Sequence, residues 1–211
     1  MPPGGGDLQR IVVGVDGSPE GEHAHAMASA LARRCGARIL AVAAEGAVAP
    51  PTGARRIGGV PGVELPRFAE SVAADLLVLG RRPRNGIGPP LGSVGDAVVR
   101  RSRVACLLVP LRIPALRRVL VALDPGPRGP VVRDFAVRFA AAAGVELASI
   151  SVRRWREGEL STEILAEAVE VGADAIAFGV HRGGPLGGAE QMGVSHHLVR
   201  EAPTALLTIP L

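Results

Sequence analysis

The sequence predicts an α/β protein made of two tandem units, each an open parallel sheet covered by helices. The first observation is repetition: RIVVGVD at 10–16 returns as RVLVALD at 118–124, and ACLLVPL at 105–111 returns as ALLTIPL at 205–211. The second is that short apolar, β-branched runs alternate with amphipathic segments in each copy. Strands that alternate with helices pair in parallel through right-handed crossovers, so both copies have the same predicted architecture.

The repeat also sets the predicted domain boundaries. Gly36 matches Gly144 and Asp75 matches Asp174, so the two copies differ in length only in their middle parts, where insertions are tolerated. We place the first unit at 8–111 and the second at 117–211. Because the connection between them is short, we expect the units to pack against each other as a pseudo-dimer.

The first unit opens with a strand at 10–15, a continuous β-branched run typical of a strand buried on both faces. Ser18 is a good helix N-cap, Pro19 suits the first turn, and Gly36 ends the helix. The inward face of this helix has apolar residues at helical spacing: Ala24, Met27, Ala28, Leu31 and Cys35. The elements expected next are strands at 38–43 and 56–60, a helix at 64–74, a strand at 75–79, a helix at 93–101 and a strand at 104–109.

The second unit repeats this order. We expect a strand at 118–123 and a helix at 130–143, with Val131, Phe135, Phe139 and Ala142 facing inward. The remaining expected elements are a strand at 145–152, a helix at 161–172, a strand at 174–178, a helix at 194–201 and a strand at 204–209.

Composition excludes several chemistries. Apolar residues make up 47% of the chain but aromatic residues only 2%, so the core must be built from Ala, Val, Leu and Ile. The net charge is +4, and all 24 basic residues are Arg. Without Lys the chain has no Walker A loop and no Schiff-base chemistry. Cys35 and Cys106 form no CxxC motif, which argues against a structural zinc site and favours reduced core residues.

The amino terminus carries no signal of export. Residues 1–7 lack a basic region followed by an apolar run, and no stretch is apolar enough to span a membrane. We therefore expect a soluble cytoplasmic protein with no membrane insertion.

Three short motifs carry a resemblance to a known family. VGVDGS at 13–18, ADLLVLG at 74–80 and LGSVGD at 91–96, followed by VACLLVP at 104–110, together resemble the universal stress protein family in its tandem form. The resemblance implies Rossmann-like units of the adenine nucleotide alpha hydrolase type, with five parallel strands. It also implies edge-to-edge pairing of the closing strands and a stress-linked regulatory role. The expected function is therefore that of a regulatory protein and not of an enzyme.

The resemblance also implies where a nucleotide would bind. The ATP-binding branch has the signature Gly-x2-Gly-x9-Gly-Ser/Thr. The first unit has Gly80, then Pro83 in place of the second glycine, then Gly92 and Ser93 after eight residues in place of nine. The first unit therefore keeps the outline of the signature but departs from it at two points.

Phosphates approach backbone N–H groups most closely where glycine opens a helix, which is the pattern at Gly92 and Ser93. Ser93 would donate its hydroxyl to a phosphate oxygen or ligate the accompanying Mg²⁺, and Gly80 would let the backbone approach the ligand. Asp16 is similar in position to the acidic residue of the family. The predicted ATP-binding residues are Val15, Asp16, Ala44, Leu79, Gly80, Arg81, Gly92, Ser93 and Val94. The alternative is that Ser93 only caps its helix and Asp16 only ends its strand.

The corresponding site of the second unit is predicted to be degenerate, because Val194 stands where the first unit has Ser93. A shift of register that used Gly183–Gly184 or Gly187–Gly188 would restore a phosphate-binding turn. His181, His196 and His197 lack the spacing of a metal site.

Arginines gather around the first predicted site, at positions 81, 82, 84, 100, 101 and 103. Guanidinium groups suit phosphates and acidic protein surfaces, but no aromatic residue is interleaved to stack on bases, which disfavours nucleic acid. Three functions are therefore open. The first is a regulatory protein that binds ATP or a related adenine nucleotide in its first unit. The second is an interaction protein with vestigial pockets, which presents its Arg-rich surface to another protein or to a membrane transporter. A further homodimer is open for either. The third, a nucleotide-directed enzyme, rests on fold analogy alone.

Overall fold

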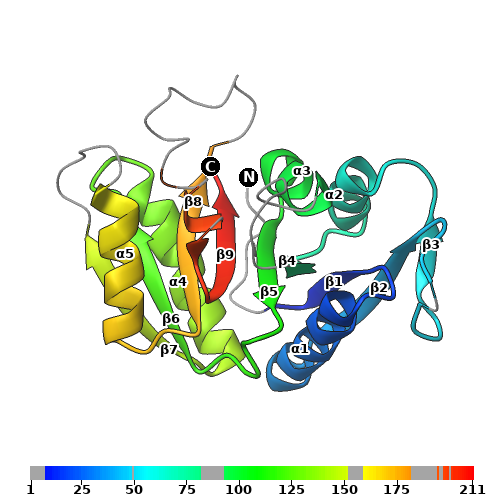
Figure 1. The fold of residues 1–211 in the computed structure, drawn as a ribbon, viewed down its shortest axis with the longest axis horizontal. Helices are drawn as coiled ribbons and strands as arrows, with labels where there is room; N and C mark the ends of the chain where they lie inside the picture. Colours follow the sequence, from blue (N-terminus) through cyan, green and yellow to red (C-terminus); the bar gives the residue numbers. More distant parts are fainter. Residues whose placement is uncertain are drawn as a thin grey trace.

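The computed structural model describes residues 8–48, 50–81, 93–151, 159–181, 194, 197–199 and 201–211. It confirms an α/β fold with a mostly parallel sheet (Figure 1). The strands are β1 (Arg10–Val15), β2 (Arg38–Ala44), β3 (Arg55–Ile57), β4 (Leu76–Arg81), β5 (Ala105–Pro110), β6 (Arg118–Leu123), β7 (Glu146–Ser151), β8 (Ala175–Val180) and β9 (Ala205–Pro210). The helices are α1 (Pro19–Cys35), α2 (Pro61–Ser71), α3 (Ser93–Arg101), α4 (Gly129–Ala143) and α5 (Glu159–Glu170). Residues 197–199 and 201 are also helical, and we call them the last helical segment.

The described strands form one sheet in the order β3-β2-β1-β4-β5-β9-β8-β6-β7. Its first part pairs in parallel from β3 to β5, and its second part pairs in parallel from β7 to β9. The two parts meet at one antiparallel contact, in which Leu107 of β5 lies opposite Leu207 of β9. We call this contact the seam; Figure 1 shows β5 and β9 side by side at the centre of the molecule.

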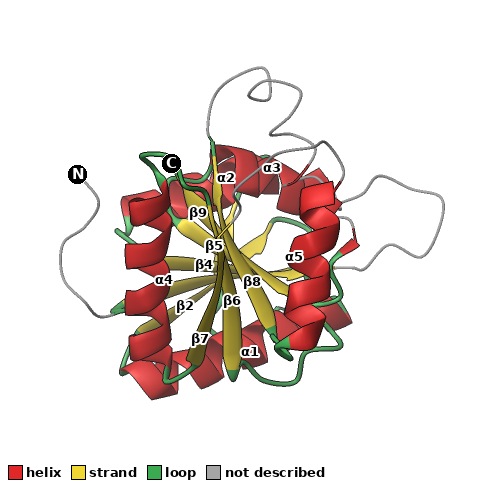
Figure 2. Cartoon of the chain, turned by 90° about the vertical axis from the view of Figure 1, so that its left-hand side faces the viewer, coloured by secondary structure: helices red, strands yellow, loops and turns green. Residues whose placement is uncertain are grey.

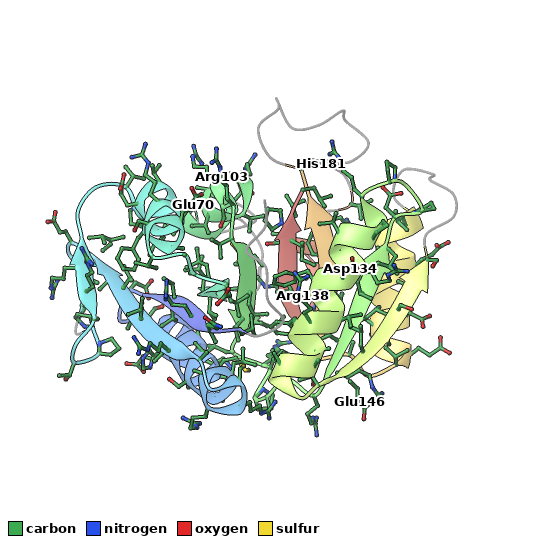
Figure 3. The ribbon with its side chains drawn as sticks, turned by 180° about the vertical axis from the view of Figure 1, so that it is seen from behind. Glu70, Arg103, Asp134, Arg138, Glu146 and His181 are labelled. Carbon is green, nitrogen blue, oxygen red and sulfur yellow. The ribbon has the colours of Figure 1, made fainter. Side chains whose placement is uncertain are left out.

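The antiparallel seam reverses the direction of the second set of strands. The carboxyl ends of β1, β2 and β4, which we call the first rim, therefore lie at the opposite edge of the sheet from those of β6 and β8, the second rim. Figure 3 shows this arrangement. Glu70 and Arg103, from the amino-terminal side of the first strands, lie at the same end of the molecule as His181, which follows β8.

Helices cover both faces of the sheet, as Figure 2 shows. Because side chains alternate along a strand, Ile11 and Val13 of β1 pack in the core that includes α1 and α4. Val12 packs on the opposite face, in the core that includes α2, α3, α5 and the last helical segment. These three valine and isoleucine side chains are completely buried, as expected for strands covered on both faces.

Helix α1 begins and ends where the sequence predicts. Ser18 is its N-cap, and the Ser18 side chain accepts a hydrogen bond from the N–H of Gly21. Gly36 is the C-cap, with the left-handed φ of 69° that favours glycine. The predicted inward residues Ala24, Met27, Ala28 and Leu31 are all buried.

Helix α4 corrects one prediction. Val131 is 49% exposed, and Phe135 and Ala142 are only partly buried. The buried face instead runs through Val132, Ala136, Phe139, Ala140 and Ala143. The prediction was wrong by one position at Val131, because two faces of this Ala- and Val-rich helix have apolar residues at helical spacing and hydropathy alone does not choose between them.

Smaller differences concern element ends. The short strand predicted at 56–60 is β3 at 55–57, and the helix predicted at 64–74 begins at Pro61, where proline suits the first turn. The predicted boundary between the two units falls in the connection from β5 to β6, and the domain division itself stays a prediction. Among the described residues, no helix combines the length and apolarity needed to cross a membrane.

Candidate functional site at the first rim

Asp16 lies directly after β1, on the exposed surface of the first rim. Its Oδ1 accepts hydrogen bonds from the N–H of Ser18 at 3.0 Å and from the Ser18 hydroxyl at 2.5 Å. The Ser18 hydroxyl oxygen in turn accepts from the N–H of Gly21 at 3.1 Å. Asp16 therefore ends its strand and also orders the first turn of α1.

The turn after β1 is closely packed against the segment that follows β2. Gly17 has φ 79°, and a side chain there would overlap the backbone carbonyl group of Val48. Val48 is itself 73% exposed. The chain after β2 therefore borders the first rim, where the exposed apolar residue Val48 lies beside the turn at Gly17.

The packing of α1 on β4 requires glycine at position 80, a requirement that the sequence alone did not indicate. A Cβ at Gly80 would overlap the backbone carbonyl of Glu20 and lie 2.8 Å from the backbone nitrogen of Gly21. The first turn of α1 therefore packs directly on the end of β4. This approach requires glycine at position 80 whether or not a ligand binds.

Val15 and Leu79 are core residues at the first rim. Each side chain is 5% exposed, so only their backbones reach the strand ends. Ala44, the last residue of β2, is partly exposed and pairs with Ile57 of β3. The carbonyl of Ala44 accepts a hydrogen bond from the N–H of Ala47 at 3.1 Å, which turns the chain back toward the rim.

The Arg81 side chain is not at the rim. It is 3% exposed, and it donates to the backbone carbonyls of Val199 at 2.7 Å and Thr204 at 3.0 Å, and also to that of Ala202. Burial lowers the pKa of Arg81 to about 10. The guanidinium that we predicted to recognise a ligand is therefore occupied by the second half of the chain, and only the Arg81 backbone lies at the strand end.

The start of α3 is described only in part. Ser93 is the first residue of α3 and Val94 is partly buried, next to Gly62 of α2. Gly92 lies outside the described residues, as do Arg82 and Arg84, and the side chain of Ser93 is not described either. The structure thus brings together the ends of β1, β2 and β4, while the predicted phosphate-binding turn stays a prediction.

The amino terminus of α1 is poorly suited to a phosphate. It already has the Ser18 cap and two carboxylates in its first turn, Glu20 and Glu22, which would repel an anion. The first turn of α3 also contains a carboxylate, Asp96, and the assignment of phosphates to the start of α3 stays a prediction. No group of three or more metal-ligating side chains occurs among the described residues.

The second rim has a different set of side chains. Asp124 Oδ1 accepts from the N–H of Gly126 at 2.8 Å, but the N-cap of α4 is Arg128, which makes no side-chain capping bond. The Arg128 guanidinium donates to Nδ1 of His181. Val194 is helical and partly buried, while the glycines at 183, 184, 187, 188 and 193 lie outside the described residues, as does His196.

Sequence reasoning missed the contact of Arg81 with the second half. Two differences between the repeats relate to this contact. Arg81 of the first repeat corresponds to Val180 of the second, and Ser102 of the first corresponds to Ala202 of the second. A motif search does not combine two such positions, because they are far apart in the sequence and become neighbours only through the seam.

The fold and the first rim define a class: a Rossmann-like α/β protein whose candidate ligand site lies at the carboxyl ends of parallel strands. The comparisons agree. Residues 41–110 match the sequence model of the Universal stress protein family. This segment runs from the last residues of β2 to the end of β5, and the match confirms the resemblance for that part of the chain. No curated protein shows significant sequence similarity to the chain.

Solved structures with the same fold include a universal stress protein and a functionally unknown protein. A universal stress protein from Archaeoglobus fulgidus DSM 4304 has a TM-score of 0.66 at 16% identity, over 96% of this chain and 98% of that one. A functionally unknown protein from Pseudomonas aeruginosa PAO1 has a TM-score of 0.71 at 12% identity, over 97% and 93%. At such identities the likeness shows the fold alone. A universal stress protein in complex with cAMP is 31% identical, over 49% of this chain and 98% of that one, with a TM-score of 0.42.

Proposed function

We propose that the chain is a tandem member of the universal stress protein family that binds ATP or a related adenine nucleotide at its first rim. The observation that carries the proposal is that the family match at 41–110 contains Ala44, the end of β4 and the start of α3. These are the elements to which we assign the ligand. The match therefore falls on the half in which we predict a working site.

The two rims differ in the residue that would meet a phosphate. Ser93 opens α3 in the first unit, whereas the corresponding Val194 has no hydroxyl. A β-branched apolar side chain cannot donate to a phosphate oxygen, so we assign one nucleotide to each chain and not two. Asp16 would bind the ribose hydroxyls or the Mg²⁺ that accompanies the phosphates.

The proposed function is binding and regulation, not catalysis, and the proposed location is the cytoplasm. Within the first rim the Asp16 carboxylate is engaged in ordering the start of α1. A nucleotide bound there would change the surface formed by the ends of β1, β2 and β4. A protein partner that binds this surface would therefore bind with a different affinity when the nucleotide is present.

A second candidate is an interaction protein that binds no nucleotide. Pro83 in place of glycine and the shortened Gly80–Gly92 spacing favour it, and so does the burial of the Arg81 guanidinium away from the rim. Under this proposal the exposed side chains of Arg100, Arg101 and Arg103 serve an acidic protein partner; they lie at the carboxyl end of α3, away from the first rim, and not around the predicted site. The two proposals differ in whether the purified chain holds a nucleotide.

The first experiment is to denature the purified protein and identify the released small molecules by chromatography and mass spectrometry. About one equivalent of ATP or ADP per chain is the expected result. If none is released, calorimetry with ATP, ADP, AMP and cAMP, each with Mg²⁺, tests uptake. No release and no uptake would overturn nucleotide binding and favour the interaction protein.

Two variants then test the residues. Gly92→Val should abolish binding, because a side chain at this position blocks the approach of phosphates to the backbone. Ser93→Ala should weaken binding by about 1 kcal/mol, the value of one neutral hydrogen bond. Gly193→Val, the matched change in the second unit, should leave binding unchanged. Equal loss in Gly92→Val and Gly193→Val would contradict a site confined to the first rim.

A further inference from the structure

The chain ends the helices before β5 and β9 in two different ways. Before β5, the Ser102 hydroxyl donates to the carbonyl of Val104 at 2.7 Å and accepts from the N–H of Val104 at 3.1 Å. Before β9 the corresponding residue is Ala202, which has no hydroxyl. There the Thr204 carbonyl accepts from Nη2 of Arg81 instead. The Thr204 carbonyl of the second unit therefore accepts its hydrogen bond from the first unit, whereas the equivalent Val104 carbonyl accepts one from Ser102 of the same unit.

This contact of Arg81 is strong and one-sided. The carbonyls at the end of a helix carry partial negative charge, and a cation that donates to them makes charge-assisted bonds. The counterpart of Arg81 is Val180: Arg81 pairs with Pro110 at the end of β4, as Val180 pairs with Pro210 at the end of β8. Valine cannot donate, so the residue at this position of β8 makes no contact of the kind that Arg81 makes across the seam.

The end of β4 is therefore fixed from three directions by three consecutive residues. Leu79 packs against Gly14 of β1, where a Cβ would lie 2.5 Å from its Cδ2. Gly80 lies under the first turn of α1, as described above. Arg81 is bound to the carbonyls before β9. The first two contacts come from the first unit, and the third comes from the second unit.

We propose that Arg81 is a positioning residue through which the second unit fixes the ligand-binding end of β4. This inference rests on the proposed function, because Leu79, Gly80 and the Arg81 backbone belong to the predicted nucleotide site. It assigns the second unit a role that does not require a ligand of its own. The nucleotide affinity of the first rim then depends on Ala202 and Thr204, which lie across the seam.

The test separates positioning from stability. Arg81→Val leaves the carbonyls before β9 without their donors, so this change alone is expected to lower stability. The double variant Arg81→Val with Ala202→Ser gives the second unit the serine that the first unit has at Ser102, so that the helix end supplies its own hydrogen bond. Arg34→Gln is the control, since Arg34 also donates to a backbone carbonyl outside the first unit, that of Leu116 in the connection between the units, at 2.9 Å, but from the far end of α1.

Urea unfolding and ATP calorimetry are measured on the full chain in each variant. We expect the double variant to regain part of the stability lost in Arg81→Val, because the new serine supplies a donor to the Thr204 carbonyl but not to those of Val199 and Ala202. It should still bind ATP about tenfold more weakly than the wild type, within the range for residues that couple two regions. Arg34→Gln should keep the wild-type affinity. Wild-type affinity in the double variant would overturn the positioning role while leaving nucleotide binding intact. A wild-type chain that binds no nucleotide would overturn both.

A measurement on the wild type keeps the proposal testable if the variants do not fold. Amide hydrogen exchange is followed at Ala202 and Ala205, whose N–H groups donate to the carbonyls of Leu198 and Asp174. ATP should slow exchange at both amides by severalfold, because it immobilises the strand end to which Arg81 belongs. Unchanged exchange at these amides, with ATP bound, would contradict the coupling.

Discussion

Asp75 and Asp174 make the same hydrogen bonds at the same place in the two halves. Asp75 Oδ2 accepts from the N–H groups of Gln9 and Arg10, both at 2.8 Å. Asp174 Oδ2 accepts from those of Arg117 at 2.8 Å and Arg118 at 3.0 Å. Each carboxylate thus joins the start of one strand to the start of its neighbour, β4 to β1 and β8 to β6.

Replacement of either aspartate by asparagine should lower the free energy of unfolding by about 1 to 3 kcal/mol, because an uncharged acceptor replaces a carboxylate that serves two backbone donors. Urea unfolding of Asp75→Asn and Asp174→Asn checks this. Asp134→Asn is the control, since Asp134 is an exposed residue of α4 whose ion pair with Arg133 spans 3.6 Å. A cost as large in Asp134→Asn as in the other two would contradict the argument.

Gly80→Ala should lower the free energy of unfolding by about 1 to 3 kcal/mol, since the added methyl group must displace the first turn of α1. Gly58→Ala provides the comparison: a Cβ there meets only the Glu45 carboxyl group, at the ordinary contact distance of 3.4 Å. Thermal unfolding of both variants measures the difference. A stable Gly80→Ala chain that has lost only nucleotide affinity would show that glycine serves the ligand and not the helix.

Ser18→Ala should lower stability by about 1 kcal/mol, the usual cost of removing a helix N-cap. The change also removes a donor to Asp16 Oδ1, so the carboxylate becomes freer to move. Urea unfolding gives the first effect. Amide exchange in α1 should quicken at the N–H of Gly21, which donates to the Ser18 hydroxyl; unchanged exchange there would argue against the capping role.

Stability should fall as the pH rises from 9 to 10. Burial raises the pKa of Cys106 from 9.0 to about 11, so above pH 9 the unfolded thiol loses its proton while the folded one keeps it. Burial also raises the pKa of Cys35, which adds a change of the same sign. Arg81 acts in the opposite direction, because burial lowers its pKa to about 10, and its contribution increases stability only above that pH.

The chain has neither Lys nor Tyr, whose side chains would titrate in the same range, so the effect of the thiols can be measured directly. From pH 8 to pH 10 the Cys106 thiol should account for roughly 1 kcal/mol of lost unfolding free energy. Urea unfolding at both pH values, repeated with Cys106→Ala, checks this. The variant should show a smaller fall with pH, even if it is less stable throughout. An equally steep fall would assign the effect to other groups.

The strands and α1 could be predicted from the sequence because their signals are local. The run at 10–15 has no polar side chain after Arg10, and Ser18 with Gly36 encloses seventeen helical residues. Helix α4 lacks such a signal: Arg128 makes no side-chain cap, and Val131 competes with Val132 for the inward face. There the choice of face was decided by packing.

In the candidate site, the positions of residues at strand ends could be predicted, but the directions of their side chains could not. Asp16 and Gly80 were expected at strand ends and lie there, because parallel strands bring their carboxyl ends to one edge. The direction of the Arg81 side chain was not predictable, since its partners are backbone carbonyls more than a hundred residues away and carry no signature in the sequence. The same holds for Gly80, whose need for glycine comes from the carbonyl of Glu20.

The antiparallel pairing of β5 with β9 places the first rim and the second rim at opposite ends of the molecule, which we call its two poles. Whatever occupies one pole is separated from the other by the full length of the strands, so molecules bound at the two poles do not compete for space. Each pole was therefore free to diverge in sequence, as the exchange of Ser93 for Val194 illustrates. Coupling between the poles would therefore act over that distance, through the sheet and through the core that α1 and α4 share.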